Sequence, residues 1–185
     1  MKQVILALTL FIFAGCAEIQ LGDTDIGKIR TKYHIVKGTH GMTLKLQSST
    51  SYVYFEADLS GAVYDNKALG LDSLDWNKLY GFRAIKVHDN SYRIGFRLNG
   101  SMWEFCAYSY VDGKRQEFEY LGSCEINGKP QFIIDLSDNS CYYEMVGVSS
   151  VITNGNKPKH LFKSFPYFGG NRKAPNSIDI WIKEL

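Results

Sequence analysis

Short runs of alternating apolar and polar residues, separated by turn-forming residues, are the feature that most constrains the fold of this chain. They follow one another from Met42 to the C-terminus, with Gly, Asn, Asp and Ser between them. The last run is the clearest, because Ile178, Ile180 and Ile182 alternate with polar or aromatic residues. Successive side chains of a strand point to opposite faces of a sheet, so a period of two indicates half-buried strands. No stretch with a helical period exceeds about two turns, and the sequence therefore predicts an all-β domain.

The predicted strands favour two antiparallel sheets packed face to face as a jelly-roll-like β-sandwich. A closed β-barrel is the alternative fold. A single helical turn is predicted within residues 71–79, where Asp72 and Ser73 can cap it. The predicted strands span residues 42–46, 52–59, 84–88, 92–98, 102–111, 115–124, 131–136, 141–148, 160–165 and 177–183.

Two residue pairs in the middle of the chain predict tight hairpins and set a strand register. Asn99-Gly100 and Asp112-Gly113 suit two-residue type I′ turns, whose central positions both need a positive φ. Counting outward gives these opposite pairs on an apolar face that is predicted to be the core: Ile94 with Phe105, Phe96 with Trp103, Ala107 with Phe118, and Phe105 with Tyr120. On the other face the same counting gathers charged residues and tyrosines: Arg93, Arg97, Glu104, Tyr108, Tyr110, Arg115, Glu117 and Glu119.

The N-terminus resembles a bacterial lipoprotein signal peptide. Lys2 precedes an apolar run over residues 4–13, which is too short for a helix to span a bilayer core of roughly 30 Å. Phe13-Ala14-Gly15-Cys16 resembles a lipobox, in which small residues precede a cysteine that is lipidated and becomes the mature N-terminus. The resemblance implies removal of residues 1–15 and a membrane anchor of several acyl chains on Cys16. A plain secretory signal peptide is the alternative.

The rest of the chain divides into a tether and a domain. Residues 16–41 are predicted to be the lipidated cysteine and a tether, because they contain no clear apolar period, and residues 42–185 are predicted to be the β-sandwich. Ala17 stands where an Asp would signal retention in the inner membrane. The predicted location is therefore the cell envelope, and the outer membrane in a Gram-negative host.

Charge and cysteine content limit the partners and the cross-links. The 21 Lys and Arg residues nearly balance the 19 Asp and Glu residues, so no nucleic-acid partner is predicted. Cys106, Cys124 and Cys141 allow at most one internal disulfide. Because the predicted register places Cys106 opposite Glu119 and not opposite Cys124, the preferred pair is Cys124 with Cys141.

Two segments resemble a group of secreted bacterial β-sandwich proteins of unassigned function. The first is NSYRIGFR at residues 90–97, followed by EFCAYSYVDGKR at residues 104–115. The second is FPYFGGN at residues 165–171, followed by APN at residues 174–176. The resemblance covers residues 79–185. It implies the sandwich fold but no particular activity.

Known catalytic motifs are absent from the sequence. It contains no Gly-x-Ser-x-Gly elbow, no His-Glu-x-x-His pair and no phosphate-binding loop. Glu104, Glu117 and Glu119 could supply the two carboxylates of a glycosidase, which stand about 5 to 10 Å apart. The neighbouring arginines make a lattice of cross-strand ion pairs the simpler interpretation. A glycan hydrolase or lyase is thus the less favoured alternative, and no catalytic residue, metal ligand or cofactor is predicted.

A binding function is predicted for the same face. Tyr108 and Tyr110 lie two apart on one strand, so both rings can stack on sugar faces while the charged groups bind hydroxyls. The alternative is that these rings only cover the sheet under a loop. Tyr167, Phe168 and Asn171 form a second candidate beside a Gly pair, or else their aromatic rings plug the end of the sandwich. The predicted function is a lipid-anchored envelope protein that binds carbohydrate, and the alternative is an envelope or phage-encoded lipoprotein that binds a protein partner.

Overall fold

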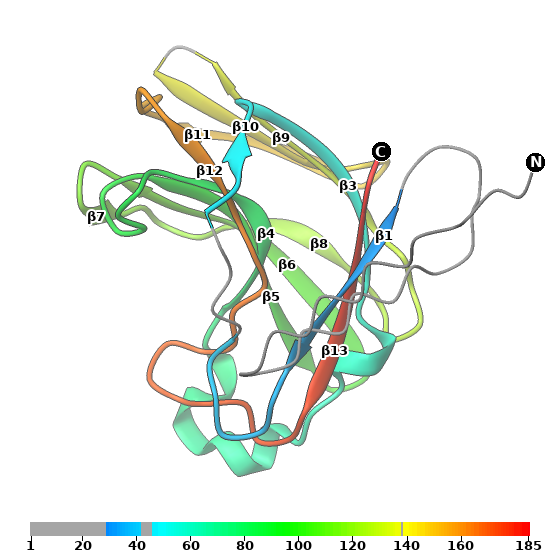
Figure 1. Ribbon diagram of the computed structural model, residues 1–185. Coiled ribbons are helices and arrows are strands. Elements are labelled where there is room, and N and C mark those ends of the chain that lie inside the picture. Colours follow the sequence, from blue (N-terminus) through cyan, green and yellow to red (C-terminus); the bar gives the residue numbers. More distant parts are fainter. Residues whose placement is uncertain (1–28, 42–45, 138) are drawn as a thin grey trace, which may run out of the picture.

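Two antiparallel sheets face each other in the computed structural model, which describes residues 29–41, 46–137 and 139–185 (Figure 1). In order, the first sheet contains β1 (Arg30–Ile35), β13 (Ile178–Glu184), β3 (Tyr52–Asp58), β9 (Gln131–Ser137), β10 (Ser140–Met145) and β11 (Ser149–Asn154). The second contains β2 (Ser48–Ser49), β12 (Leu161–Ser164), β4 (Asn77–Arg83), β5 (Ser91–Asn99), β6 (Met102–Val111) and β7 (Lys114–Arg115), and β8 (Glu119–Glu125) also pairs with β6. The predicted jelly-roll β-sandwich is confirmed, and the alternative of a closed barrel is wrong.

Aromatic rings fill the space between the sheets. Phe105 on β6 and Phe132 on β9 belong to different sheets, and their ring centroids are 4.9 Å apart. Ile178, Ile180 and Ile182 of β13 are buried, as their alternation predicts. The intervening residues of each strand form the outer faces of the sandwich.

Strand β1 lies within the segment that was predicted to be a tether. Residues 30–35 pair with β13 along their whole length, and Tyr33 and Ile35 are buried. The prediction of a tether over residues 16–41 is therefore wrong for this part. Two buried positions are too few to produce a recognisable alternation, which is why the sequence did not reveal the strand. Cys16 and the predicted signal peptide lie outside the described residues.

Strand β4 also differs from prediction. Every residue from Asn77 to Phe82 is buried, and the register of β4 against β5 shifts between Lys78 and Gly81, so Leu79, Tyr80 and Phe82 all belong to the core. An irregularity of this kind interrupts the alternation of a strand. The strand predicted at residues 84–88 is wrong, since these residues form bends and turns.

Several smaller differences concern the ends of elements. The strand predicted over residues 115–124 divides into β7 and β8, the strand predicted over residues 141–148 ends at Met145, and β11 was not predicted. Most of the strand predicted at residues 42–46 lies outside the described residues. Two 3-10 segments, η1 (Ser60–Ala62) and η2 (Asn66–Leu74), join β3 to β4. Asp65 caps η2 by accepting a hydrogen bond from the Lys67 amide, in place of the predicted caps farther along. No helix in the described part of the chain is long and apolar enough to cross a membrane.

The hairpin between β5 and β6 turns one residue later than predicted. Asn99 pairs with Met102, so the two central residues are Gly100-Ser101. A positive φ is found at Gly100 alone of these two, which is the type II′ pattern. The predicted pairs across this hairpin are therefore wrong by two residues, and Arg97 comes to lie opposite Glu104. A shift of two leaves every side chain on its predicted face.

The second hairpin follows the predicted turn and then departs from it. Asp112 and Gly113 both have a positive φ, and the pairing of β6 with β7 is as predicted. Beyond Arg115 the chain leaves the ladder and rejoins it as β8 in a shifted register. Phe118 and Tyr120 are 38% and 54% exposed, so their predicted place in the core is wrong.

Candidate binding site

A pocket of about 720 Å³ lies between the outer face of the second sheet and the segment that follows β12. Residues 164–167 and 169–171 supply one side of the lining, and β4, β5, β6 and β7 supply much of the other. The alternation of β5 and β6 explains this location: Ile94 and Ala107 face the core, so Arg93 and Tyr108 project from the opposite face. The pocket lies on the face that the sequence predicted to be polar.

Two buried cations meet the ring of Tyr108 in this pocket. The guanidinium carbon of Arg93 lies 5.0 Å from the centroid of the Tyr108 ring, and the Lys78 ammonium nitrogen lies 4.8 Å from it. Arg93 stands opposite Tyr108 on β6 and opposite Gly81 on β4. Tyr108 is only 5% exposed, so among the tyrosines of the lining the accessible rings are Tyr110 and Tyr167.

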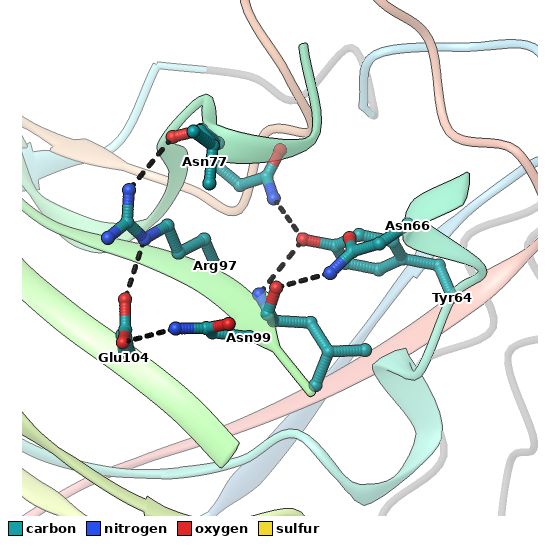
Figure 2. Close-up of polar contacts among 8 residues, drawn as sticks. Tyr64, Asn66, Asn77, Arg97, Asn99 and Glu104 are labelled. Carbon is teal, nitrogen blue, oxygen red and sulfur yellow. Dashed lines mark hydrogen bonds and ion pairs between the residues drawn. The ribbon is translucent and has the colours of Figure 1, made fainter. Parts of the chain in front are cut away.

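The segment over the pocket is fastened to the first residues of β4. Lys78 and Tyr167 exchange two backbone hydrogen bonds of 2.9 and 2.8 Å, and the Lys78 ammonium donates to the Gly169 carbonyl at 3.0 Å. The Gly169 amide donates to the side-chain oxygen of Asn77. Figure 2 shows that Asn77 in turn donates to the hydroxyl of Tyr64, at 3.0 Å. A buried polar chain therefore holds this segment in place.

Burial without an anionic partner weakens the protonation of both cations. Desolvation by burial, followed by the charge of Arg93, lowers the pKa of Lys78 to about 8. Burial likewise lowers the pKa of Arg93. Arg83 and Arg115 add two more cationic side chains to the lining, and no carboxylate lines the pocket within the described part of the chain. The site therefore has a positive potential and a low local dielectric.

Six of the residues predicted from the sequence meet in the pocket: Arg93, Tyr108, Tyr110, Arg115, Tyr167 and Asn171. Phe168 does not, because its ring is buried against Tyr64 at a centroid distance of 4.9 Å. Glu117 and Glu119 are exposed and do not line the pocket. The sequence offered two interpretations of this loop, a binding site or a plug at the end of the sandwich. The first applies to Tyr167, which borders the pocket, and the second to Phe168, which packs into the core.

Arg97 and Glu104 form an ion pair beside the pocket. The Arg97 guanidinium donates to Glu104 at 2.7 Å and to the Leu74 carbonyl at 3.1 Å, and Asn99 donates to Glu104 at 2.8 Å (Figure 2). Burial alone would raise the pKa of Glu104, but the hydrogen bonds from Asn99 and Arg97 outweigh it and lower the pKa. An ionised carboxylate held in this way is unsuited to act as a general acid near neutral pH.

Four lining residues with polar side chains were missed from the sequence: Lys78, Arg83, His88 and Ser164. Lys78 carries the one usable signal, since a lysine beside Leu79 and Tyr80 in a buried run needs a polar partner. Arg83 and Ser164 are the last residues of β4 and β12, and His88 follows β4. No distinctive sequence pattern surrounds these three residues.

A row of aromatic rings extends from the pocket along the outer face. Centroid distances are 6.1 Å from Tyr110 to Tyr108, 5.2 Å from Tyr108 to Phe118, and 6.3 Å from Phe118 to Trp76. The guanidinium of Arg97 lies 4.3 Å from the centroid of the Trp76 ring. The row extends the aromatic border of the pocket as far as Trp76.

The predicted disulfide is wrong. Cys106, Cys124 and Cys141 are free thiols. Cys124 lies opposite Trp103 in the second sheet, whereas Cys141 lies opposite Leu136 in the first. The predicted register excludes Cys106 but does not determine the distance between Cys124 and Cys141.

No protein-family model matches the sequence, and no curated protein matches it either. Solved structures do resemble the fold. A β-glucanase of Bacillus licheniformis is 9% identical with a TM-score of 0.42, and the match covers 88% of this chain and 80% of that chain. A functionally unknown protein from Saccharomyces cerevisiae is 9% identical with a TM-score of 0.47, and the match covers 88% and 87%. An alginate lyase of polysaccharide lyase family 7 is 12% identical with a TM-score of 0.40, and the match covers 89% and 71%. These likenesses concern the jelly-roll β-sandwich and carry no function by themselves.

Proposed function

We propose that this protein binds an oligosaccharide in the pocket on the second sheet. The observation that carries the proposal is the combination of accessible rings, Tyr110 and Tyr167, with hydrogen-bonding cations around one cavity of about 720 Å³. Aromatic rings pack on the apolar faces of sugars, and guanidinium and ammonium groups donate to hydroxyls.

The lining argues for binding over hydrolysis. A glycosidase of the usual kind needs two carboxylates about 5 to 10 Å apart at the scissile bond. Among the described residues the pocket has none, and Glu104 is occupied by Arg97 and Asn99. The glutamates that the sequence offered for such chemistry therefore do not form a catalytic pair in this site.

Removing the accessible rings should weaken binding. We expect the variant Tyr110→Ala with Tyr167→Ala to bind its glycan about tenfold or more weakly, since central aromatic contacts contribute 1.4 kcal/mol or more. The measurement is a glycan array of neutral and acidic oligosaccharides, probed with detergent-solubilised full-length protein. Tyr52→Ala is the matched control, because Tyr52 is 49% exposed on the other sheet. Unchanged glycan binding by the double variant would refute the site, and a folded protein without any glycan hit would favour a protein partner.

We also propose that the protein acts in the cell envelope, attached to the membrane through lipidated Cys16. The proposal is supported by the lipobox-like sequence Phe13-Ala14-Gly15-Cys16 and by the position of β1, which begins at Arg30 and leaves a short segment after Cys16. Such a segment would hold the sandwich close to the membrane surface. In a Gram-negative host we expect the outer membrane.

Substituting Cys16 should release the protein from the membrane. In cells fed labelled palmitate, we expect the wild-type protein to carry label and to sediment with membranes, and Cys16→Ser to do neither. Cys124→Ser serves as control, because this thiol lies in the folded domain. Membrane association that survives Cys16→Ser would contradict the anchor, while sugar binding in the pocket would be unaffected by that result.

A further inference from the structure

Arg93 is a buried cation with an unsatisfied donor. Only 6% of its surface is exposed, and its Nε atom, which is buried, has no hydrogen-bond partner within the described residues. None of the ion pairs found there includes Arg93. A buried guanidinium is normally paired, because an unpaired buried charge is strongly unfavourable. The contacts within the free protein therefore do not account for the burial of this charge.

Lys78 is a second buried cation, next to Arg93. It is 7% exposed, and its ammonium group donates to the carbonyls of Trp76 and Gly169, each at 3.0 Å. An ammonium group has three donors, so one is available to a ligand. The carboxylate that acts electrostatically on Lys78 is Asp75, which lies beside Gly170 and outside the lining. Two neighbouring buried cations thus share one pocket without a carboxylate between them.

We propose that the oligosaccharide is acidic, and that Arg93 and Lys78 bind its anionic group, either a uronate carboxylate or a sulfate ester. This inference rests on the proposed sugar-binding function. The anion would accept from the Arg93 guanidinium, which lines the pocket, and from the remaining Lys78 donor, while Arg115 adds charge at the exposed side of the lining. Neutral sugars would leave the two buried charges uncompensated, so the pocket should discriminate against them.

The test compares sugars that differ only in their charge. Isothermal titration of the full-length protein would use tetragalacturonate against its methyl ester, and sulfated maltotetraose against maltotetraose. We expect one acidic member to bind about 10- to 100-fold more tightly than its neutral partner, which also identifies the anionic group. In Arg93→Met we expect this preference to fall by a similar factor, and in wild type we expect added NaCl to weaken acidic binding.

Other variants keep the inference falsifiable. Arg115→Gln changes an exposed residue of the lining and should also weaken acidic binding, whereas Lys114→Gln, its exposed neighbour outside the lining, should not. Removing an unpaired buried charge should leave the free energy of unfolding of Arg93→Met unchanged or raised. A clear loss would show that the guanidinium has a structural role, and would overturn its assignment to the ligand.

The outcomes separate this inference from the function on which it rests. If neutral glycans bind as well as acidic ones, and Arg93→Met binds them equally, the inference fails and sugar binding stands. If no glycan of either kind binds the folded protein, both fail. Acidic binding that is unaffected by both Arg93→Met and Arg115→Gln would place the anion elsewhere and would likewise overturn the inference.

Discussion

Phe105→Ala is expected to lower the free energy of unfolding by about 3–5 kcal/mol, since truncating a buried Phe removes both its burial and its packing. The ring is fully buried and lies 4.9 Å from that of Phe132, so it joins the two sheets. A loss of this size is a large fraction of the roughly 5–15 kcal/mol that stabilises a domain. Urea denaturation, followed by fluorescence, measures it directly.

Phe118→Ala is the matched control, and it also tests the register of β8. The register predicted from the sequence placed Phe118 in the core, whereas the structure shows it 38% exposed beside Tyr108. We therefore expect a loss of about 1 kcal/mol or less, as for most positions outside the core. Equal losses at Phe105 and Phe118 would mean that the β6–β8 pairing described above is incorrect.

Gly169→Ala should loosen the segment over the pocket. Gly169 has a φ of 73°, and a Cβ atom added there would lie 2.0 Å from the Arg172 carbonyl oxygen. Backbone strain of this kind is worth about 1–3 kcal/mol per residue. Because the Gly169 amide and carbonyl bond to Asn77 and Lys78, we expect both a lower free energy of unfolding and faster hydrogen exchange at these positions.

The neighbouring Gly170 provides the comparison. A Cβ atom at Gly170 would lie 3.4 Å from an Asp75 carboxylate oxygen, which is an ordinary contact, and its φ is not in the left-handed region. Gly170→Ala should therefore change the free energy of unfolding by about 0.5 kcal/mol or less. If Gly169→Ala were tolerated as well as Gly170→Ala, the backbone conformation over the pocket would not be the one described here.

Much of the polar face could be predicted because alternation along a strand is a local property. Arg93, Tyr108 and Tyr110 share a face whichever of two hairpin registers is used, since a shift of two residues keeps every side chain on its side. The register depends on which two residues occupy the centre of the turn. Both Gly100-Ser101 and Asn99-Gly100 could do so, and the structure has Gly100-Ser101 there. Local sequence does not decide between two turns that both contain a glycine at a suitable place.

The incorrect or missing predictions have a common origin: they concern contacts between segments that are distant in the sequence. Lys78 was missed because its pocket is completed by residues such as Gly169, 91 positions farther along the chain. Glu104 could be proposed as catalytic until Arg97 and Asn99 were seen to occupy it. Strand β1 went unnoticed because its burial depends on pairing with β13 at the other end of the chain.

By itself, the sequence determined the all-β class and the division of β5 and β6 into an apolar and a polar face, and it favoured a sandwich of two sheets over a closed barrel. These follow from period-two alternation and turn residues, which act over a few positions. Only the tertiary structure decided which polar residues share the pocket, which thiols stay free, and which cations remain unpaired. Those properties depend on the pairing of the segment after β12 with β4, and therefore on distances between residues far apart in the chain.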